Sequence, residues 1–298
     1  MDEIKRIDYV SDYNDFCGVE TLNPLVSVVD WSKCPPMYHT KQLFGFYAIF
    51  LKQVKCGDLI YGRNYYDYQE GTLVCIAPRQ VVGVRDNGET FQPKGLALIF
   101  HPDLLRGTTL GKNIKNYTFF SYESREALHI SEQEKQITID CLKKIEAELQ
   151  HAIDRHSRTL IVSYIELLLN YCTRFYERQF ITRENANKDI LIGFEQLLND
   201  YFQSNKPQKL GLPSVRYFAE GLSLSPNYFG DLIKKETGTS ALEYVQSKLI
   251  EIAKERILQP NKTVSEVAYD LGFQYPQHFS RMFKKKVGIT PNEYKAIV

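Results

Sequence analysis

The sequence predicts an α+β protein, with strands in its N-terminal part and helices in the rest. Up to about residue 118, short runs rich in Val, Ile, Phe and Tyr alternate with Gly, Pro, Asn and Asp, which is typical of an antiparallel barrel or sandwich. From residue 131 onward, apolar residues recur at helical spacing. Near the C-terminus one helix-turn-helix pattern occurs twice, which indicates an all-α domain.

The N-terminal strands are predicted from six segments bounded by turn residues. These segments are LVSVVDWS (25–32), LFGFYAIFLKQV (43–54), GDLIYGR (57–63), GTLVCIAP (71–78), QVVGV (80–84) and GLALIFHP (95–102). Together they assign residues 1–130 to one domain.

Two long helices are predicted next, over residues 131–180. The first begins with a capping box, Ser131 with Glu134, and places Ile137, Cys141, Ile145 and Leu149 on one face. The second, residues 157–180, has a wide apolar face. This pair is suited either to dimerisation or to docking on the strands.

The stretch ITRENANKD lacks periodicity, so we expect a linker over residues 181–188. A helix over residues 189–202 then opens the C-terminal domain, residues 189–298. The preceding polar stretch and the change of pattern together place the domain boundary here.

Charge is uneven along the chain. The net charge is only +1, yet residues 204–298 hold 14 Lys/Arg against 9 Asp/Glu. A basic C-terminal third fits a partner that carries phosphates. The six cysteines form no C-x-x-C pair, so neither a zinc site nor a redox motif is indicated. Without an apolar leader or a long uncharged run, we expect a cytoplasmic protein that does not enter a membrane.

The repeat aligns two copies with equivalent positions 49 or 50 residues apart. The pairs are Val215/Val264, Phe218/Val267, Ala219/Ala268, Leu222/Leu271, Leu224/Phe273, Pro226/Pro276, Phe229/Phe279, Lys234/Lys284, Lys235/Lys285, Gly238/Gly288, Glu243/Glu293 and Tyr244/Tyr294. So many matches over a short stretch indicate one structural unit used twice.

Each copy has the signals of helix, tight turn and helix. Ser214 and Thr263 are N-caps of the first helices, and prolines open the second helices. Gly238 and Gly288 are suited to left-handed C-caps. A continuous helix, ALEYVQSKLIEIAKERIL, joins the copies.

The second helix of each copy is predicted to bind DNA. Its inner face is apolar, with Phe229, Leu232 and Ile233 in one copy and Phe279, Met282 and Phe283 in the other. In a helix-turn-helix, the outer face of such a helix reaches base edges in the major groove. Gln and Asn suit adenine and Arg suits guanine, while Lys suits phosphates. A charged outer face on a helix is usually exposed to solvent without any binding role. Here the duplication and the excess of basic residues in this part of the chain favour DNA binding.

These motifs resemble the tandem helix-turn-helix domain of AraC/XylS-type transcription regulators, over residues 189–298. The matching stretches are SEVAYDLGF, YPQHFSRMFKKKVGITPNEY and SPNYFGDLIKKETGTSALEY. The resemblance implies binding to double-stranded promoter DNA by a ligand-responsive activator in a bacterial cytoplasm, with RNA polymerase as a further partner. The DNA-binding positions are Asn227, Tyr228, Gly230, Asp231, Lys234, Lys235, Gln277, His278, Ser280, Arg281, Lys284 and Lys285. Gly230 and Asp231 depart from the family pattern, so the second copy is expected to specify more bases.

The N-terminal strands with their two helices resemble the cupin-type effector and dimerisation domain of the same family. Enzymatic cupins bind metal through closely spaced histidines, and the six histidines here never form H-x-H. We therefore expect no catalytic residue, no metal and no cofactor. A small-molecule effector is expected inside the barrel, with Trp31, Tyr38 and Tyr47 as candidate contacts, although core packing is the commoner role of such residues.

Three hypotheses remain open from the sequence. The chain is a DNA-binding regulator controlled by a small molecule, a regulator controlled by a protein partner, or a cupin-type enzyme fused to a DNA-binding module. A bound transition metal would favour the enzyme, and a barrel filled by its own side chains would favour the protein partner. Homodimerisation is compatible with each of them.

Overall fold

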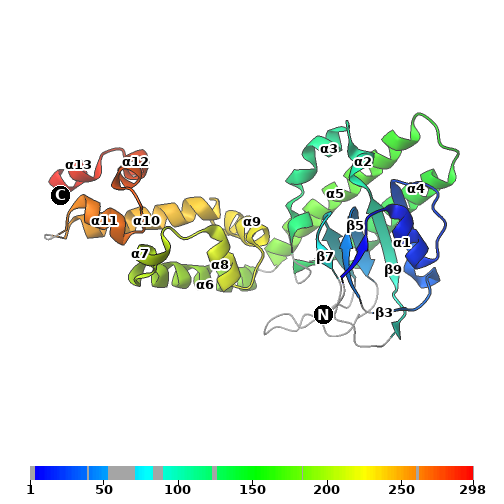
Figure 1. Cartoon of the computed structure of the whole chain (residues 1–298), viewed down its shortest axis with the longest axis horizontal. Helices are drawn as coiled ribbons and strands as arrows, with labels where there is room; N and C mark the ends of the chain where they lie inside the picture. Colours follow the sequence, from blue (N-terminus) through cyan, green and yellow to red (C-terminus); the bar gives the residue numbers. More distant parts are fainter. Residues whose placement is uncertain are drawn as a thin grey trace. The chain divides into compact units, whose positions relative to one another are not determined.

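The chain separates into two compact units, Met1–Thr182 and Arg183–Val298 (Figure 1). The computed structural model describes residues 4–38, 40–52, 71–82, 90–122, 126–182, 184–259 and 262–297. The predicted strand GDLIYGR and the end of QVVGV lie outside these residues.

The first unit contains the strands. They are β1 (Ile4–Ile7), β2 (Val26–Asp30), β3 (Met37–Tyr38), β4 (Lys41–Phe44), β5 (Tyr47–Lys52), β6 (Thr72–Ile76), β7 (Val81–Val82), β8 (Thr90–Phe91), β9 (Gly95–Phe100) and β10 (Leu128–His129).

The largest sheet has the order β10-β6-β5-β9-β2, and all its pairs are antiparallel. In a second sheet, β4 pairs parallel with β1 and antiparallel with β7, and β3 pairs with β8 in a third. The predicted α+β class with a mainly antiparallel N-terminal sheet is confirmed. The described strands form three sheets and do not close into a barrel.

The helices of the first unit lie between and after the strands. They are α1 (Val10–Cys17), α2 (Pro102–Leu105), α3 (Thr109–Asn113), α4 (Glu132–Gln150) and α5 (Ser157–Thr182), with short 3-10 turns at Trp31–Lys33, Ile114–Asn116 and Thr118–Ser121. Helix α1 was not predicted from the sequence; its buried residues are Val10, Tyr13, Asn14 and Cys17. Their spacing places one face of α1 against the sheets.

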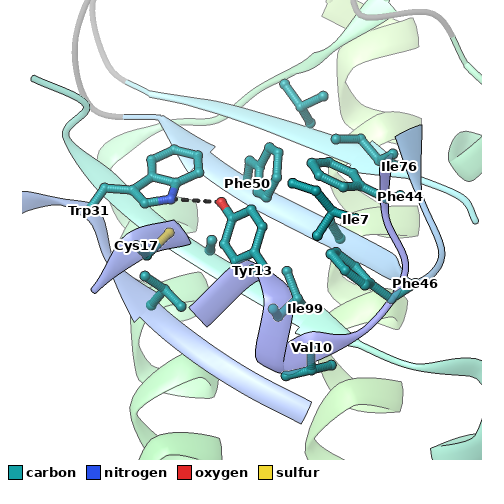
Figure 2. Packing of buried hydrophobic residues seen from close by; sticks show 14 of the residues in the cluster. Ile7, Val10, Tyr13, Cys17, Trp31, Phe44, Phe46, Phe50, Ile76 and Ile99 are labelled. Carbon is teal, nitrogen blue, oxygen red and sulfur yellow. Dashed lines mark hydrogen bonds between the residues drawn. The ribbon is translucent and has the colours of Figure 1, made fainter. Parts of the chain in front are cut away.

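The core of this unit is filled by aromatic side chains (Figure 2). The Trp31 indole Nε1–H donates a hydrogen bond to Tyr13 Oη at 3.0 Å. The Trp31 ring meets Phe50 edge-on at 4.9 Å, and Tyr13 meets Phe44 edge-on at 5.8 Å. These contacts satisfy the polar atom of Trp31 and leave its ring buried among other side chains.

One predicted strand is broken in two. Residues 43–54 were expected as a single strand, but β4 ends at Phe44 and β5 begins at Tyr47. The backbone passes so close to β1 at this point that a Cβ on Gly45 would lie 2.5 Å from the Asp8 carbonyl oxygen. Gly45 therefore allows the chain to turn where a larger residue would clash.

The two predicted long helices are confirmed as α4 and α5, which pack on each other, with α4 also against β2 and α5 against β10. The capping box of Ser131 and Glu134 is present. Arg178 of α5 donates to both Glu134 carboxylate oxygens, at 2.9 and 2.8 Å. The buried face of α4 is Thr138, Cys141, Leu142 and Ile145, slightly rotated from the predicted one.

The second unit is helical throughout its regular structure. Its helices are α6 (Glu184–Gln203), α7 (Lys206–Leu210), α8 (Val215–Gly221), α9 (Pro226–Thr237), α10 (Ala241–Ile257), α11 (Val264–Asp270), α12 (Pro276–Val287) and α13 (Pro291–Ile297). Helix α10 contacts α9, α11, α12 and α13, so it joins the two copies as predicted (Figure 1).

Each copy has an aromatic core of its own. In the first, the Phe194 ring lies 5.1 Å from Phe218, 5.0 Å from Phe229 and 5.4 Å from Tyr244. In the second, Phe279 lies 5.4 Å from Phe273 and 5.7 Å from Phe283, which lies 5.6 Å from Tyr294. Phe229 and Tyr244 are the repeat equivalents of Phe279 and Tyr294.

The described residues of the predicted linker, residues 181–188, are helical and not irregular. Helix α5 extends to Thr182 and α6 begins at Glu184. Asn187 is buried, and its amide donates to Glu236 of α9 at 3.0 Å. A polar residue thus occupies a buried position, which is why the helical pattern of this stretch is not visible in its hydrophobicity.

Candidate nucleic-acid interface

The helix boundaries of both copies are set by the predicted caps. The Ser214 hydroxyl accepts from the Tyr217 amide at 3.2 Å, and the Thr263 hydroxyl accepts from the Glu266 amide at 3.2 Å. Glu266 completes a capping box with Thr263. Helices α9 and α12 end at Gly238 and Gly288, whose φ values of 73° and 93° favour glycine.

Apolar side chains fix α9 and α12 in place. Phe229, Leu232 and Ile233 of α9 are fully buried, and so are Phe279 and Phe283 of α12. Met282 is partly buried. With one face held by the core, the opposite face of each helix is presented outward at a fixed orientation.

The outer face of α12 carries the predicted polar side chains. Gln277, His278, Arg281, Lys284 and Lys285 are exposed and Ser280 is half-buried. Hydrogen-bond donors and acceptors therefore stand at the N-terminal end of the helix, with cations at its C-terminal end. Helix α12 thus brings six predicted residues together on one face.

Two residues beside this face were not predicted. Lys286 extends the exposed cationic end of α12, and the run KKK in the sequence was a signal for it. Tyr275 is the N-cap residue of α12, is 58% exposed, and its ring lies 5.5 Å from the His278 ring. An exposed aromatic pair at the start of this helix offers flat apolar surface beside the polar groups.

The outer face of α9 carries fewer of the predicted residues. Asn227, Lys234 and Lys235 are exposed, and Gly230 and Asp231 are half-buried. The assignment of Tyr228 to this face was wrong, because its side chain is only 4% exposed. Tyr228 stands four residues before buried Leu232, so it lies on the core side of α9.

The basic ends of both helices act on the same carboxylate. The pKa of Glu243, at the start of α10, is lowered first by its hydrogen bond with the Ser240 side chain and further by the charges of Lys286 and Lys234. One of these lysines belongs to α12 and the other to α9. Positive charge from both copies is thus gathered near the beginning of α10.

The three candidate effector contacts are not brought together. Trp31 is a core residue bonded to Tyr13, which corrects its assignment to a ligand cavity. Tyr38 is 59% exposed on β3. Tyr47 stacks on Phe100 at 5.2 Å and lines an open pocket of about 250 Å³ beside α2 and α3. The pocket is also lined by Leu105, Arg106, Thr108, Lys112 and Ile114, with three further residues.

Within the described parts of both units, no group of three or more His, Cys, Asp or Glu side chains is placed to hold a metal ion. None of the helices among the described residues is long and apolar enough to cross a membrane.

A family model described as a helix-turn-helix domain matches residues 218–297. The bifunctional transcriptional activator/DNA repair enzyme AdaA of Bacillus subtilis is 31% identical over 99 residues, which are 33% of this chain and 46% of AdaA. The transcriptional regulatory protein YesN of the same organism is 38% identical over 92 residues, 29% of this chain and 25% of YesN.

Among solved structures, a transcriptional regulator of Chromobacterium violaceum with an AraC-type DNA-binding domain is 21% identical. The match covers 38% of this chain and 94% of that one, with a TM-score of 0.33. The matched part of this chain spans less than half the length of AdaA and of YesN. The matching family model and the paired, capped helices agree on the same residues. The C-terminal unit of this chain therefore contains a helix-turn-helix domain, and the chain is similar to these bacterial transcription regulators.

Proposed function

We propose that this protein is a sequence-specific DNA-binding transcription regulator whose helices α9 and α12 enter two segments of the major groove. The observation that carries the proposal is the outer face of α12. There, exposed Gln277, His278 and Arg281 stand on a helix anchored by buried Phe279 and Phe283. The same scaffold occurs in α9.

The chemistry of this face suits base edges and phosphates. Gln277 can pair with adenine and Arg281 with guanine, each through two hydrogen bonds. Lys284, Lys285 and Lys286 suit phosphates, which supply affinity but no sequence information. Two recognition helices that enter successive grooves on one side of DNA would sit about 34 Å apart.

The substitution Arg281→Ala tests this assignment. It removes a side chain suited to guanine, so specific binding should weaken by about 1–3 kcal/mol and the preference at one base pair should relax. Gel-shift titrations with duplexes selected from a random library measure both quantities. Lys284→Ala is the matched comparison: it should weaken binding to all sequences alike and reduce the salt dependence. Unchanged affinity and base preference in Arg281→Ala would contradict the proposal.

Control of DNA binding by the first unit takes one of two forms. The pocket beside Tyr47 supports a small-molecule effector that makes the protein a ligand-responsive activator. Arg106 and Lys112 in its lining favour an anionic compound. In contrast, the described core around Tyr13, Trp31 and Phe50 is filled by its own side chains, which supports control by a protein partner.

Thermal melting of the full chain with small carboxylates and phosphates distinguishes these forms. A compound that binds the pocket should raise the melting temperature, and Tyr47→Ala should remove the shift. No shift with any compound, together with DNA binding that changes when a co-purified protein is added, would favour the protein partner.

We also propose that the first unit forms a homodimer through α5. Leu160, Tyr164, Leu167 and Tyr171 follow one another at intervals of four, three and four residues, which is the spacing of a coiled-coil seam. Leu160 and Leu167 are 43% and 44% exposed, and the two tyrosines are partly exposed. A second copy of α5 offers a matching apolar surface.

The substitution Leu167→Glu should convert the dimer to a monomer, because it places a charge in the centre of the seam. Sedimentation equilibrium of the full chain measures the mass. Thr159→Glu, on an exposed part of α5 outside the seam, is the control and should leave the dimer intact. A wild-type chain that is monomeric at all concentrations would contradict the proposal.

A further inference from the structure

The two helix-turn-helix copies are joined at a second place besides α10. In the first copy, residues 204–214 connect α6 to α8 and include the short helix α7. In the second copy, the equivalent connection between α10 and α11 is shorter, residues 258–263. Helix α7 packs against α6 of its own copy and against α11 of the other. The extra length of the first copy thus reaches across to the second.

The crossing contact is made by side chains and by backbone. Gln208 of α7 donates its amide to Asp270 Oδ1 of α11 at 2.7 Å. Just after α11, a Cβ on Gly272 would lie 2.6 Å from the Gly211 carbonyl oxygen and 2.9 Å from that of Pro207. The two backbones therefore meet with no room for a side chain at Gly272, whose φ of +92° also favours glycine.

Two basic side chains, those of Arg256 and Lys262, bond to the same region around Asp270. Arg256 of α10 donates one Nη to the carbonyl of Phe202, at the end of α6, and the other to the Asp270 carbonyl at 3.2 Å. Lys262 bonds the second carboxylate oxygen of Asp270. The Tyr201 hydroxyl donates to the Gly211 carbonyl at 2.9 Å, which fixes the residue that Gly272 touches.

These contacts converge on the turn that leads into α12. Asp270 ends α11, Gly272 follows, and α12 begins at Pro276. A chain that linked the copies through α10 alone would let them bend and twist about that helix. A second attachment at this turn removes that freedom, because the two connections close a ring.

We propose that Gln208, Arg256 and Asp270 form a clasp that fixes α12 relative to α9, and so determines which spacing between two DNA segments the protein accepts. These are positioning residues, since their side chains act by bonding other protein atoms. The spacing part of the inference rests on the proposed DNA-binding function. The rigidity part does not.

Rigidity is measured on the full chain without DNA. Spin labels at Lys235→Cys and Lys285→Cys report the separation of α9 and α12, because all native cysteines lie in residues 17–172 and the described ones are buried. The parent should give one narrow distance distribution. Gln208→Ala and Asp270→Ala should broaden it, and Gln196→Ala, an exposed glutamine on α6, should not. An equally narrow distribution in both clasp variants would overturn the clasp.

Spacing is measured with duplexes selected from a random library by the wild-type chain. Insertion or deletion of two base pairs between the protected segments should weaken wild-type binding strongly. In Gln208→Ala and Asp270→Ala this spacing penalty should fall by about tenfold, the scale of one hydrogen bond to a charged group. Binding to each segment alone should be unchanged.

An unchanged spacing penalty in folded variants would overturn the assigned role. If the wild type selects no sequence at all, the proposed function fails, whereas the label distances still decide whether the clasp exists. Circular dichroism of each variant verifies that the helices remain folded.

Discussion

The two helix-turn-helix copies share a scaffold but differ at the positions that face outward. Three repeat pairs show the contrast: Asp231 stands opposite Arg281, Gly230 opposite Ser280 and Tyr228 opposite His278. In each pair, the second copy has a side chain suited to hydrogen bonding with DNA. The first copy has a carboxylate, no side chain or a buried ring. Both copies keep the same fold, and only α12 carries the full set of side chains that we propose to read bases.

The N-terminal ends of the two helices differ in the same sense. Ser225 is buried, and its hydroxyl accepts from the Tyr228 amide at 3.2 Å, so the start of α9 is closed by its own cap. At the equivalent place in α12, Tyr275 makes no cap hydrogen bond through its side chain and is exposed. The start of α12 is therefore available to a partner, whereas that of α9 serves stability.

The largest effect is expected when the buried phenylalanine that holds each helix against its core is replaced by alanine. Phe279→Ala and Phe229→Ala should each destabilise the second unit by about 3–5 kcal/mol, because both rings are fully buried. Urea unfolding with a probe in each copy measures the loss. Since α10 and the α7 contacts connect the copies, both probes should report one transition in either variant. Two separate transitions would show that the copies fold independently.

A smaller effect is expected from acid. The pKa of Glu266 is lowered, chiefly by the backbone amide of Thr263, and that of Asp270 is lowered chiefly by its bond with Lys262. Both carboxyls lie in the second copy, and the N-cap of α8 in the first copy has no such box. A lowered folded-state pKa stabilises the fold above the ordinary pKa, and that contribution is lost as the pH falls through the folded value.

We therefore expect α11 to lose protection before α8 as the pH falls below the ordinary glutamate value of 4.5. Amide hydrogen exchange at several pH values measures this order. Glu266→Gln should weaken the pH dependence at α11 and leave that at α8 unchanged. Equal acid sensitivity of the two helices would remove this difference between the copies.

The second unit was largely predictable because its local signals agree with its tertiary structure. Caps at Ser214 and Thr263, glycines after α9 and α12, and the buried phenylalanines all follow from residue type and spacing. Tyr228 was misplaced because a tyrosine is compatible with either face, and only its distance of four residues from Leu232 indicated the core. The α7 contacts were not predictable, since they depend on carbonyl groups and on a glycine in a turn.

The first unit was harder to predict because its structure depends on contacts between distant segments. The break at Gly45 is imposed by Asp8, about 37 residues earlier, and no local pattern shows it. Helix α1 is short and rich in Asp and Asn, so its apolar face was hidden. Trp31 was a reasonable candidate for ligand contact until its bond with Tyr13 placed it in the core.

The smallest expected effect is that of Gly230→Ala, which tests whether α9 lies close to DNA. A Cβ at this position meets nothing within 4 Å, and the residue is in the interior of a helix. Alanine should therefore stabilise the second unit by about 0.5–1 kcal/mol. If α9 contributes little to base reading, DNA affinity should change by no more than about twofold.

Its repeat equivalent provides the control. Ser280→Ala removes a hydroxyl from the outer face of α12 and should reduce the preference at a base pair, with little change in stability. Urea unfolding and gel-shift titration of both variants give the four values to compare. A methyl group at Gly230 that weakened DNA binding more than the loss of the Ser280 hydroxyl would mean that the glycine is needed for a close approach of α9 to DNA. The first copy would then contribute to recognition through its shape. The two copies would differ in the way they recognise DNA, and not only in how much each contributes to affinity.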